Sequence, residues 1–450
     1  MLVKIRKGVL CLKLIGTFFG LYYDHIRRSY AVRNAAKATQ SVKGGEEGPA
    51  EPRTVVIIGA SFSGYHAARL IAATLPLDGS WRIVIVEPNA HYQFTWTLPR
   101  FCVIEGHEEK TFVPYGPYLP PAAKEFIRWV HDRVELISDR DIKIEGTGER
   151  ISYDYLVVAT GAGVGLKLPS RVGAEGKEEG VKLLQQIQRR IKDAKKLVVV
   201  GGGAAGVELA TDAKQHYPDK SVTLVHSRDA VMHRFGPELQ AAALKGLKDL
   251  GVEVLLGERT VTEDEEAGVL TLRSGKTLEF DFCVNCTGQK PSSELLRGIA
   301  PDALLESGHI RVKPTLQVDS PKLSNVYACG DVAQTGVRNP NARSAMKQAQ
   351  FVADNITLAI RGQEPTYKYT PQWADSVIKL TLGLDKSITH LSDGKTELLF
   401  PGKEKDETLM IRQVWLHMGA TPFEDVDKAG QSVGQESIVD KAREVANRVP

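Results

Sequence analysis

Two glycine-rich turns, each between an apolar strand and a helical pattern, constrain the fold of this chain most strongly. The first stands in "TVVIIGASFSGYHAARLIAA" and the second, about 140 residues later, in "KKLVVVGGGAAGVELATDAK". In such a unit the glycine makes a tight turn, and the helix behind it offers unpaired N–H groups and a positive dipole end to a pyrophosphate. The two units therefore predict two Rossmann-like dinucleotide folds in one chain.

The first unit departs from the usual GxGxxG pattern at its middle position. Gly59 makes the turn and Gly64 allows close packing of helix and strand, but Ser61 stands between them. Serine is small enough for a pyrophosphate to approach, and it can donate a hydrogen bond. The next strand, "WRIVIVEP", ends in Glu87, which is placed to bind ribose hydroxyls.

The second unit has all three glycines, Gly201, Gly203 and Gly206. Its next strand ends in "SVTLVHSRD", so Ser227 and Arg228 stand near the place where an NAD-selective fold carries an acid. An acid repels the 2′-phosphate of NADPH, whereas serine and arginine are suited to bind it. This end of the strand favours NADPH, or the use of both nicotinamides.

Three further strands end in small-residue turns. "ISYDYLVVATGA" makes Gly161 a candidate cofactor-binding position, and "LEFDFCVNCTG" has the same form. "LSNVYACGDVA" ends in Asp331, and an aspartate at the carboxyl end of a strand can hold the ribityl hydroxyls of a flavin. The helix predicted in "NARSAMKQAQFVADNI" could direct its positive dipole end toward a reduced flavin.

Cys283 and Cys286 form a CxxC, a spacing that often marks a redox dithiol. On a strand, residues three apart point to opposite faces, and their Cα atoms lie about 10 Å apart, beyond the roughly 4.4–6.8 Å of a disulfide. No second pair of ligands has the spacing of a metal site, and Cys102 stands alone in the first fold. The sequence therefore predicts neither a redox dithiol nor a metal site, and electrons from a flavin must go to a diffusible acceptor such as a quinone or oxygen.

The N-terminal region is basic and apolar, with one acid, Asp24, before residue 40. Its apolar run from Gly8 to Tyr23 is about 24 Å long as a helix, shorter than the roughly 30 Å hydrocarbon core, and Lys13 interrupts it. A mitochondrial presequence or a membrane-surface anchor fits this composition better than a signal peptide, and a disordered extension is the remaining alternative. Five scattered cysteines favour a reducing compartment, and a net charge of +3 gives no reason to expect a nucleic-acid partner.

From about Thr54 to Tyr369 the sequence resembles the two-dinucleotide-binding-domain flavoproteins of the pyridine nucleotide–disulfide oxidoreductase superfamily. The stretch "VVVGGGAAGVELATDAKQHYPDKSVTLVHS", with "KTFVPY", "NVYACGDVA" and "TYKYTP", is similar to the apoptosis-inducing-factor-like branch that includes the ferroptosis suppressor protein. The resemblance implies FAD in the first fold, NAD(P)H in the second, and a quinone as electron acceptor.

The same resemblance assigns roles to individual residues. It places Glu208 in the nicotinamide site and Lys368 near the catalytic face, where a lysine could supply a cation or a proton to the departing hydroquinone. The alternative for Lys368 is an ordinary solvated loop lysine. The residues that it implies at FAD are Gly59, Ala60, Ser61, Phe62, Ser63, Gly64, Arg100, Val134 and Asp331.

The expected fold class is α/β, with two Rossmann-like domains, the second inserted in the first, and a C-terminal α+β region. The predicted segments are a targeting or anchor segment at 1–40, a linker at 41–53, the FAD-binding domain at 54–180 and 291–364, the NAD(P)-binding domain at 181–290, and an interface region at 365–450. Apolar stretches in the last segment predict core packing, a homodimer interface, or a surface that admits lipid or quinone.

These features together predict an FAD-dependent NAD(P)H:quinone oxidoreductase that contacts a membrane surface, in the mitochondrion or on the cytoplasmic face of a membrane. Two alternatives stay open. One is a soluble NAD(P)H oxidase or ferredoxin-type reductase. The other is a redox-sensing protein like apoptosis-inducing factor, with little turnover.

Overall fold

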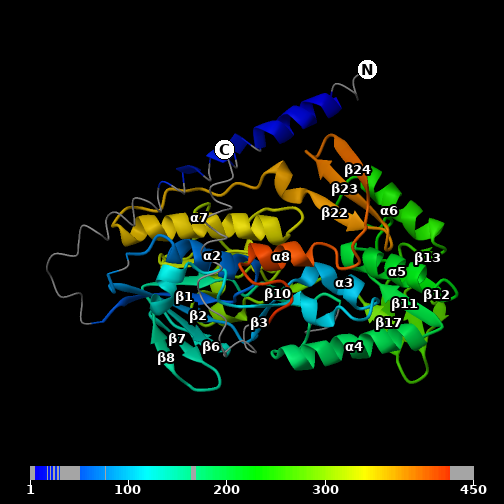
Figure 1. The fold of residues 1–450 in the computed structure, drawn as a ribbon, viewed down its shortest axis with the longest axis horizontal. Coiled ribbons are helices and arrows are strands. Elements are labelled where there is room, and N and C mark those ends of the chain that lie inside the picture. Colours follow the sequence, from blue (N-terminus) through cyan, green and yellow to red (C-terminus); the bar gives the residue numbers. More distant parts are fainter. Residues whose placement is uncertain are drawn as a thin grey trace.

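The structure is a computed structural model that describes residues 6–17, 19–20, 22–23, 26–27, 30, 51–76, 78–163 and 169–425. It has the expected α/β class, with two parallel sheets side by side and a smaller C-terminal part (Figure 1). Most of the segment predicted at 1–40, most of the linker at 41–53 and the end of the chain after residue 425 lie outside the described residues. The predicted domain boundaries stay predictions.

The first sheet is parallel and five-stranded. Its order is β20 (Val326–Ala328), β9 (Tyr155–Val158), β1 (Arg53–Ile58), β2 (Trp81–Val86) and β5 (Ile127–Val130). Helix α2 (Phe62–Ala72) packs against α7 (Ala342–Ile360) on one face. On the other face lies an antiparallel sheet of β6 (Val134–Ile137), β7 (Asp141–Ile144) and β8 (Arg150–Ser152). Both faces are covered, which explains why the central strands are continuous apolar runs.

The second sheet is parallel and four-stranded. Its order is β13 (Glu253–Leu255), β12 (Ser221–Val225), β11 (Lys196–Val200) and β17 (Phe282–Asn285). The helices of this part are α4 (Lys177–Asp193), α5 (Ala204–His216) and α6 (Pro237–Asp249). A small antiparallel sheet of β14 (Thr260–Asp264), β15 (Val269–Leu272) and β16 (Thr277–Glu279) packs on β12 through a separate apolar cluster.

The C-terminal part is the expected α+β region. Strands β22 (Ile378–Thr381), β23 (Lys386–Ser392) and β24 (Glu397–Lys403) form an antiparallel sheet, and α8 (Ile411–His417) follows. Trp415 of α8 is fully buried, and its indole N–H donates to the carbonyl oxygen of Lys110 at 2.8 Å. The stretch around Trp415 is therefore core packing against the first domain.

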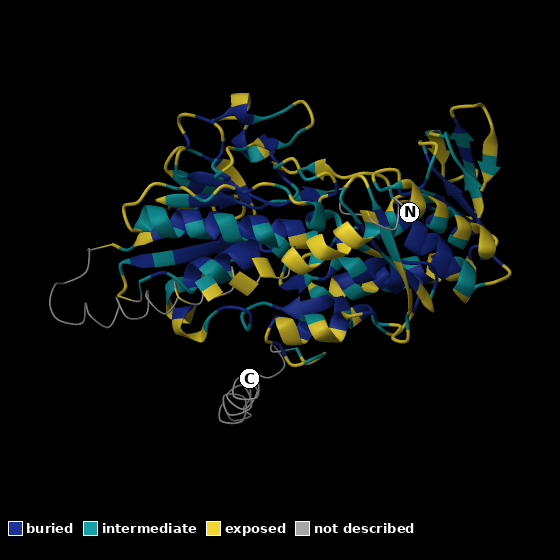
Figure 2. Cartoon of the chain, turned by 90° about the horizontal axis from the view of Figure 1, so that it is seen from above, coloured by how far each residue is buried: buried dark blue, intermediate teal, exposed yellow. Residues whose placement is uncertain are grey.

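A further helix near the N-terminus includes residues 6–17. Short elements make up the rest of the described chain, namely β3 (His91–Gln93), α3 (Leu98–Phe101), β4 (Phe112–Pro114), β10 (Ala162–Gly163), β18 (Lys290–Pro291), β19 (Ile310–Arg311) and β21 (Ala333–Gln334). Short 3₁₀ helices span Thr95–Thr97, Glu108–Thr111, Pro121–Phe126, Glu294–Leu296, Pro301–Ala303 and Trp373–Ser376. Figure 2 shows that buried residues gather on the strands and on the inner sides of the helices, and that loops and outer helix faces are exposed.

Candidate functional site

The first glycine turn joins β1 to α2. Gly59 has a φ of +91°, and a Cβ atom there would lie 2.5 Å from the carbonyl oxygen of Ala159 at the end of β9. A Cβ atom at Gly64 would lie 1.8 Å from the carbonyl oxygen of Gly59. Ser61 is the N-cap residue of α2, but its side chain makes no capping hydrogen bond. The first N–H groups of α2 therefore keep their capacity to bind an anion such as a pyrophosphate.

Glu87 lies beside this turn, as the sequence predicts. Its Oε2 accepts a hydrogen bond from the backbone N–H of Ala60 at 2.6 Å, and its Oε1 accepts one from the N–H of Asn89 at 3.0 Å. Tyr115, which the sequence interpretation did not single out, donates from its hydroxyl to the carbonyl oxygen of Ala60 at 3.1 Å. Phe62, from the first turn of α2, packs edge-on against Tyr92. A buried carboxylate and an aromatic wall thus flank the turn.

Asp331 follows β20 and Gly330, which has a φ of +80°. The N–H of Gly330 donates to Oε1 of Gln348 in α7 at 2.8 Å, and the Ser63 hydroxyl lies 2.5 Å from the position that a Cβ atom of Gly330 would take. Burial raises the pKa of the Asp331 carboxyl group, and the nearby Arg171 and His309 oppose that rise.

Arg171 was missed by the sequence interpretation because no strand or helix signal surrounds it. Its Nε donates to the carbonyl oxygen of Ala162 at 3.4 Å. Its Nη2 lies 3.4 Å from the position that a Cβ atom of Gly161 would take. Gly161 and Asp331, both predicted as cofactor-binding residues, therefore share a positive neighbour.

The predicted helix after Asp331 is present as α7, but its first N–H groups are already bound. Asn341 is the N-cap residue, and its side chain accepts from the backbone N–H groups of Arg343 and Ser344. The Ser344 hydroxyl in turn bonds to the Asn341 backbone, which completes a capping box. A bound flavin could be stabilised by the dipole of α7, but it could not accept hydrogen bonds from the N–H groups of Arg343 and Ser344.

The second glycine turn joins β11 to α5 and uses each glycine differently. Gly201 has a φ of +119°, and a Cβ atom there would lie 2.6 Å from the carbonyl oxygen of Cys286. A Cβ atom at Gly206 would lie 1.9 Å from the carbonyl oxygen of Gly201. At Gly203 a Cβ atom would meet no atom of the described chain within 4 Å. Gly203 is also the N-cap residue of α5, so this end of the helix lacks a side-chain cap as α2 does.

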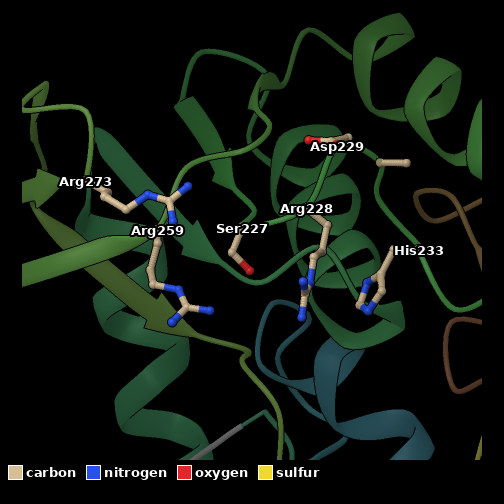
Figure 3. A pocket seen from close by; sticks show the side chains of 7 residues that line it. Ser227, Arg228, Asp229, His233, Arg259 and Arg273 are labelled. Atoms are coloured by element: carbon tan, nitrogen blue, oxygen red, sulfur yellow. The ribbon is translucent and has the colours of Figure 1, made fainter.

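His226 occupies the end of β12, where an NAD-selective fold would place an acid. Its Nδ1 accepts a hydrogen bond from the backbone N–H of Gly202 at 3.0 Å. Burial, His233 and Arg228 lower the pKa of His226 to about 4, so the ring is neutral at pH 7, as an accepting nitrogen requires. Ser227 and Arg228 follow it and line an open pocket of about 460 Å³ (Figure 3).

Arg100 and Glu208 lie together where three parts of the chain meet. Nε of Arg100, near the end of α3, donates to Oδ2 of Asp212 in α5 at 2.6 Å, and its Nη2 donates to the carbonyl oxygen of Gly383 at 3.0 Å. Glu208 lies one helical turn before Asp212, and its Oε1 accepts from the backbone N–H of Thr381 at 3.0 Å.

All of these groups are buried. Burial raises the pKa of Glu208 to about 8, and it raises that of Asp212 to about 6 even though Arg100 opposes the rise. Arg100 is thus held by Asp212 and the C-terminal part, and its predicted contact with FAD stays a prediction. The same holds for Glu208 and the nicotinamide.

Two other predicted residues lie apart from both turns. Val134 begins β6 in the antiparallel sheet that packs on the first parallel sheet. Lys368 is exposed in the loop after α7, while its neighbour Tyr369 is buried and donates from its hydroxyl to Asp375 at 3.1 Å. The structure thus gives Lys368 the surroundings of a solvated loop lysine, and its catalytic role stays a prediction.

Cys283 and Cys286 of the CxxC are free thiols, as are the other three cysteines of the chain. Cys283 packs against the apolar cluster under the small antiparallel sheet, whereas Cys286 packs against the main core, so they face opposite sides of the sheet as predicted. Burial raises the pKa of both thiols, that of Cys286 to about 12, which keeps them protonated and poorly reactive.

Comparison with known proteins agrees with the resemblance found in the sequence. The family described as pyridine nucleotide-disulphide oxidoreductase matches residues 53–350. Fe-regulated protein 8 of Mycosarcoma maydis is 33% identical over 381 residues, which cover 77% of this chain and 90% of that protein. Ferroptosis suppressor protein 1 of Homo sapiens is 28% identical over 381 residues, which cover 82% of this chain and 96% of that protein.

Among solved structures, the sulfide:quinone oxidoreductase of Aquifex aeolicus has a similar fold, with a TM-score of 0.66 at 16% identity. The match covers 84% of this chain and 94% of that chain.

Proposed function

The chain belongs to the pyridine nucleotide-disulphide oxidoreductase family, and from that premise we propose that it is an FAD-dependent NAD(P)H:quinone oxidoreductase acting at a membrane surface. Membership and fold make it an NAD(P)H-dependent flavin oxidoreductase. The quinone and the membrane are the proposed part. The observation that supports the quinone is that Cys283 and Cys286 face opposite sides of the sheet, with the pKa of both thiols raised by burial, so the CxxC is unsuited to receive electrons from a flavin.

The residues present fit FAD in the first fold and NAD(P)H in the second. Neither α2 nor α5 has a side-chain cap, so both helix starts are free to bind a pyrophosphate. Glu87 is already held beside the first turn by the N–H of Ala60, in position for a ribose. Bound FAD would supply a ring that takes a hydride from NAD(P)H and passes two electrons to the acceptor.

The chain's own contribution is orientation and charge. Asp331, at the carboxyl end of β20, would bind the ribityl hydroxyls, and Arg171 lies near enough to offset its negative charge. The uncapped start of α5 would hold the pyrophosphate of the nicotinamide coenzyme at the second sheet, and proximity would then supply much of the rate. In this scheme no side chain of the chain is required to carry electrons.

The membrane surface is proposed from the N-terminal helix, residues 6–17 (Figure 1). Its inner face is anchored to the protein, because Leu10 is fully buried, Lys7 pairs with Glu238 and Lys13 pairs with Asp393. No described helix is long and apolar enough to cross a membrane. Apolar side chains exposed on its outer side include Val9, Leu12 and Ile15, and Phe19, in the next described helical residues, is also exposed.

An apolar face of this kind, within a basic segment that has one acid, suits the surface of an anionic bilayer. Such a position would bring the protein to a lipid-soluble quinone.

The electron acceptor is tested with FAD-loaded protein in a steady-state assay of NADH and NADPH oxidation. Short-tailed ubiquinone analogues, naphthoquinones, oxygen and ferredoxin are compared as acceptors at equal protein concentration. The proposal expects the quinones to give the largest kcat/KM. Faster oxidation with oxygen or ferredoxin would contradict it, and a stable NAD(P)H complex with negligible turnover would favour a redox-sensing protein instead.

The membrane surface is tested by flotation of the full chain with vesicles of phosphatidylcholine and phosphatidylserine. The parent is expected to float, and Leu12→Glu/Ile15→Glu is expected to stay in the dense fraction. Leu136→Glu/Val261→Glu is the matched control, because these apolar side chains are also exposed but lie in the antiparallel sheets of the two domains. Equal flotation of the two double variants would refute the role of the helix.

A further inference from the structure

The pocket at the end of β12 brings together three arginines that the sequence separates. Arg228 follows β12, Arg259 precedes β14 and Arg273 follows β15. Figure 3 shows the side chains of Arg228 and Arg259 on either side of Ser227, with Arg273 beyond Arg259. The full lining is Ser227, Arg228, Asp229, Ala230, His233, Arg259 and Arg273.

Backbone hydrogen bonds fix these arginines relative to one another. The N–H of Gly257 donates to the carbonyl oxygen of Arg228 at 3.0 Å, and the N–H of Glu258 donates to that of His226 at 3.0 Å. The N–H of Arg273 donates to the carbonyl oxygen of Arg259 at 2.8 Å. Backbone hydrogen bonds therefore link the loop after β12 to the open end of the β14–β15 hairpin, where β14 begins and β15 ends, so little backbone ordering is left to occur on binding.

The hairpin places two like charges opposite each other. Thr260 pairs with Leu272 in the antiparallel register, so the adjoining residues Arg259 and Arg273 also stand face to face. Like charges in directly opposed positions of a hairpin are destabilising. Neither these two guanidinium groups nor that of Arg228 makes an ion pair within 4.0 Å with a carboxylate of the described chain. An anion between them would remove the repulsion.

The pocket carries a positive charge. Its three arginines and one aspartate give a formal charge of +2. Burial and the neighbouring arginines Arg234 and Arg228 lower the pKa of His233, so its ring is neutral at pH 7 and can donate or accept a hydrogen bond. Ser227 adds a hydroxyl group. Three forked cations around a hydroxyl match a dianionic phosphate monoester better than the hydroxyl of an unmodified ribose.

The pocket also lies where a dinucleotide fold binds the ribose of its coenzyme. β12 runs parallel to β11, and both end at the same edge of the sheet, Val200 beside Val225. The loop after β12 is tied to the glycine turn, because the N–H of Met232 donates to the carbonyl oxygen of Gly202 at 2.7 Å. In such folds the ribose next to the pyrophosphate lies at the end of this second strand.

We propose that this pocket binds the 2′-phosphate of NADPH and that Arg259 and Arg273 of the hairpin, together with Arg228, make the enzyme select NADPH over NADH. The inference rests on the proposed function, in which the second fold binds a nicotinamide coenzyme. It adds that this coenzyme is NADPH and names the residues that select it.

The test measures binding, independent of turnover, on the full chain loaded with FAD. Dissociation constants are determined by calorimetry for adenosine 2′,5′-bisphosphate and for 5′-AMP, and then for NADP⁺ and NAD⁺, which cannot reduce the bound FAD. The parent is expected to bind each 2′-phosphorylated compound at least about tenfold more tightly than its counterpart, which corresponds to about 1.4 kcal/mol. In Arg259→Gln/Arg273→Gln the 2′-phosphorylated compounds should bind about tenfold to a hundredfold more weakly, with 5′-AMP and NAD⁺ nearly unchanged.

Two further variants test whether the effect is specific to the pocket and to the arginine side chains. Arg361→Gln removes one positive charge from an exposed residue at the end of α7 and should leave all four constants unchanged. Arg259→Lys/Arg273→Lys keeps the charge and should retain part of the preference. A double glutamine variant that keeps the parent's preference, or that weakens both members of each pair equally, overturns the inference. If the parent binds NAD⁺ and NADP⁺ equally, the pocket assignment alone fails; if it binds neither, the proposed function fails with it.

Discussion

The three glycines of the second turn serve different physical purposes, and a pair of alanine substitutions separates them. Gly206→Ala adds a methyl group where α5 packs on the strand, because its Cβ would lie 1.9 Å from the carbonyl oxygen of Gly201. Gly203→Ala adds the same methyl group where no atom of the described chain lies within 4 Å. The first variant should therefore affect folding, and the second should affect binding of the coenzyme pyrophosphate.

The sizes of the two effects follow from these distances. Ordinary contact begins near 3.4 Å, so α5 must move about 1.5 Å away from β11 to accept Gly206→Ala. Overpacking costs about 1–3 kcal/mol, and because the obstacle is backbone we expect about 3 kcal/mol or more. Gly203 has an ordinary φ of −80° at the N-cap of α5, so alanine there should cost about 1 kcal/mol or less.

The assay combines urea unfolding of coenzyme-free protein with titration of NADH and NADPH. Gly206→Ala should lower the free energy of unfolding by the amount above. Gly203→Ala should unfold near the parent's midpoint but bind both coenzymes at least about tenfold more weakly, since the methyl group would stand in the path of the pyrophosphate. Parental coenzyme affinity in Gly203→Ala, or parental stability in Gly206→Ala, would refute this division of roles.

Three further outcomes are expected. The free energy of unfolding should fall as the pH rises from about 5 to about 8. Folded Glu208, with a pKa of about 8, holds a proton in this range that the unfolded carboxyl group, with a pKa near 4.5, has lost. Glu208→Gln keeps an acceptor for the N–H of Thr381 and should make this dependence on pH weaker, as urea titrations at several pH values will measure. Cys283→Ala/Cys286→Ala should retain quinone reductase activity within a few-fold per bound flavin, and a collapse of activity at full flavin content would mean that electrons pass through the pair. Asp331→Ala should be purified with less FAD than the parent, as absorbance near the flavin maximum will measure, and full loading would remove Asp331 from the cofactor site.

Local patterns in the sequence determined the two dinucleotide folds. A strand, a glycine turn and a helix are contiguous in the chain, and their requirement for positive φ and close packing is visible in the residue types alone, as at Gly59 and Gly201. The alternation of side chains along a strand likewise settled that Cys283 and Cys286 face opposite sides. The position of Glu87 beside the first turn was predictable because Glu87 directly follows β2, the strand that pairs with β1.

Only the tertiary structure decided which distant residues share a site. Nothing near Arg100 in the sequence indicates that its partner is Asp212, more than a hundred residues away in another domain, or that Gly383 completes the contact. Arg171 stands in a loop whose path no periodic pattern predicts, yet it lies beside Gly161.

The arginine pocket shows most clearly what the sequence could predict and what only the tertiary structure decided. The sequence pointed to Arg228 because that residue follows the second strand of the fold, where ribose recognition is expected. It gave no comparable signal for Arg259 and Arg273, because their role depends on the register of one hairpin and on how that hairpin is tied to the loop after β12. Short-range stereochemistry, which the residue types encode directly, therefore determined the two folds, whereas the composition of the pocket depends on long-range contacts that form only when the domain packs.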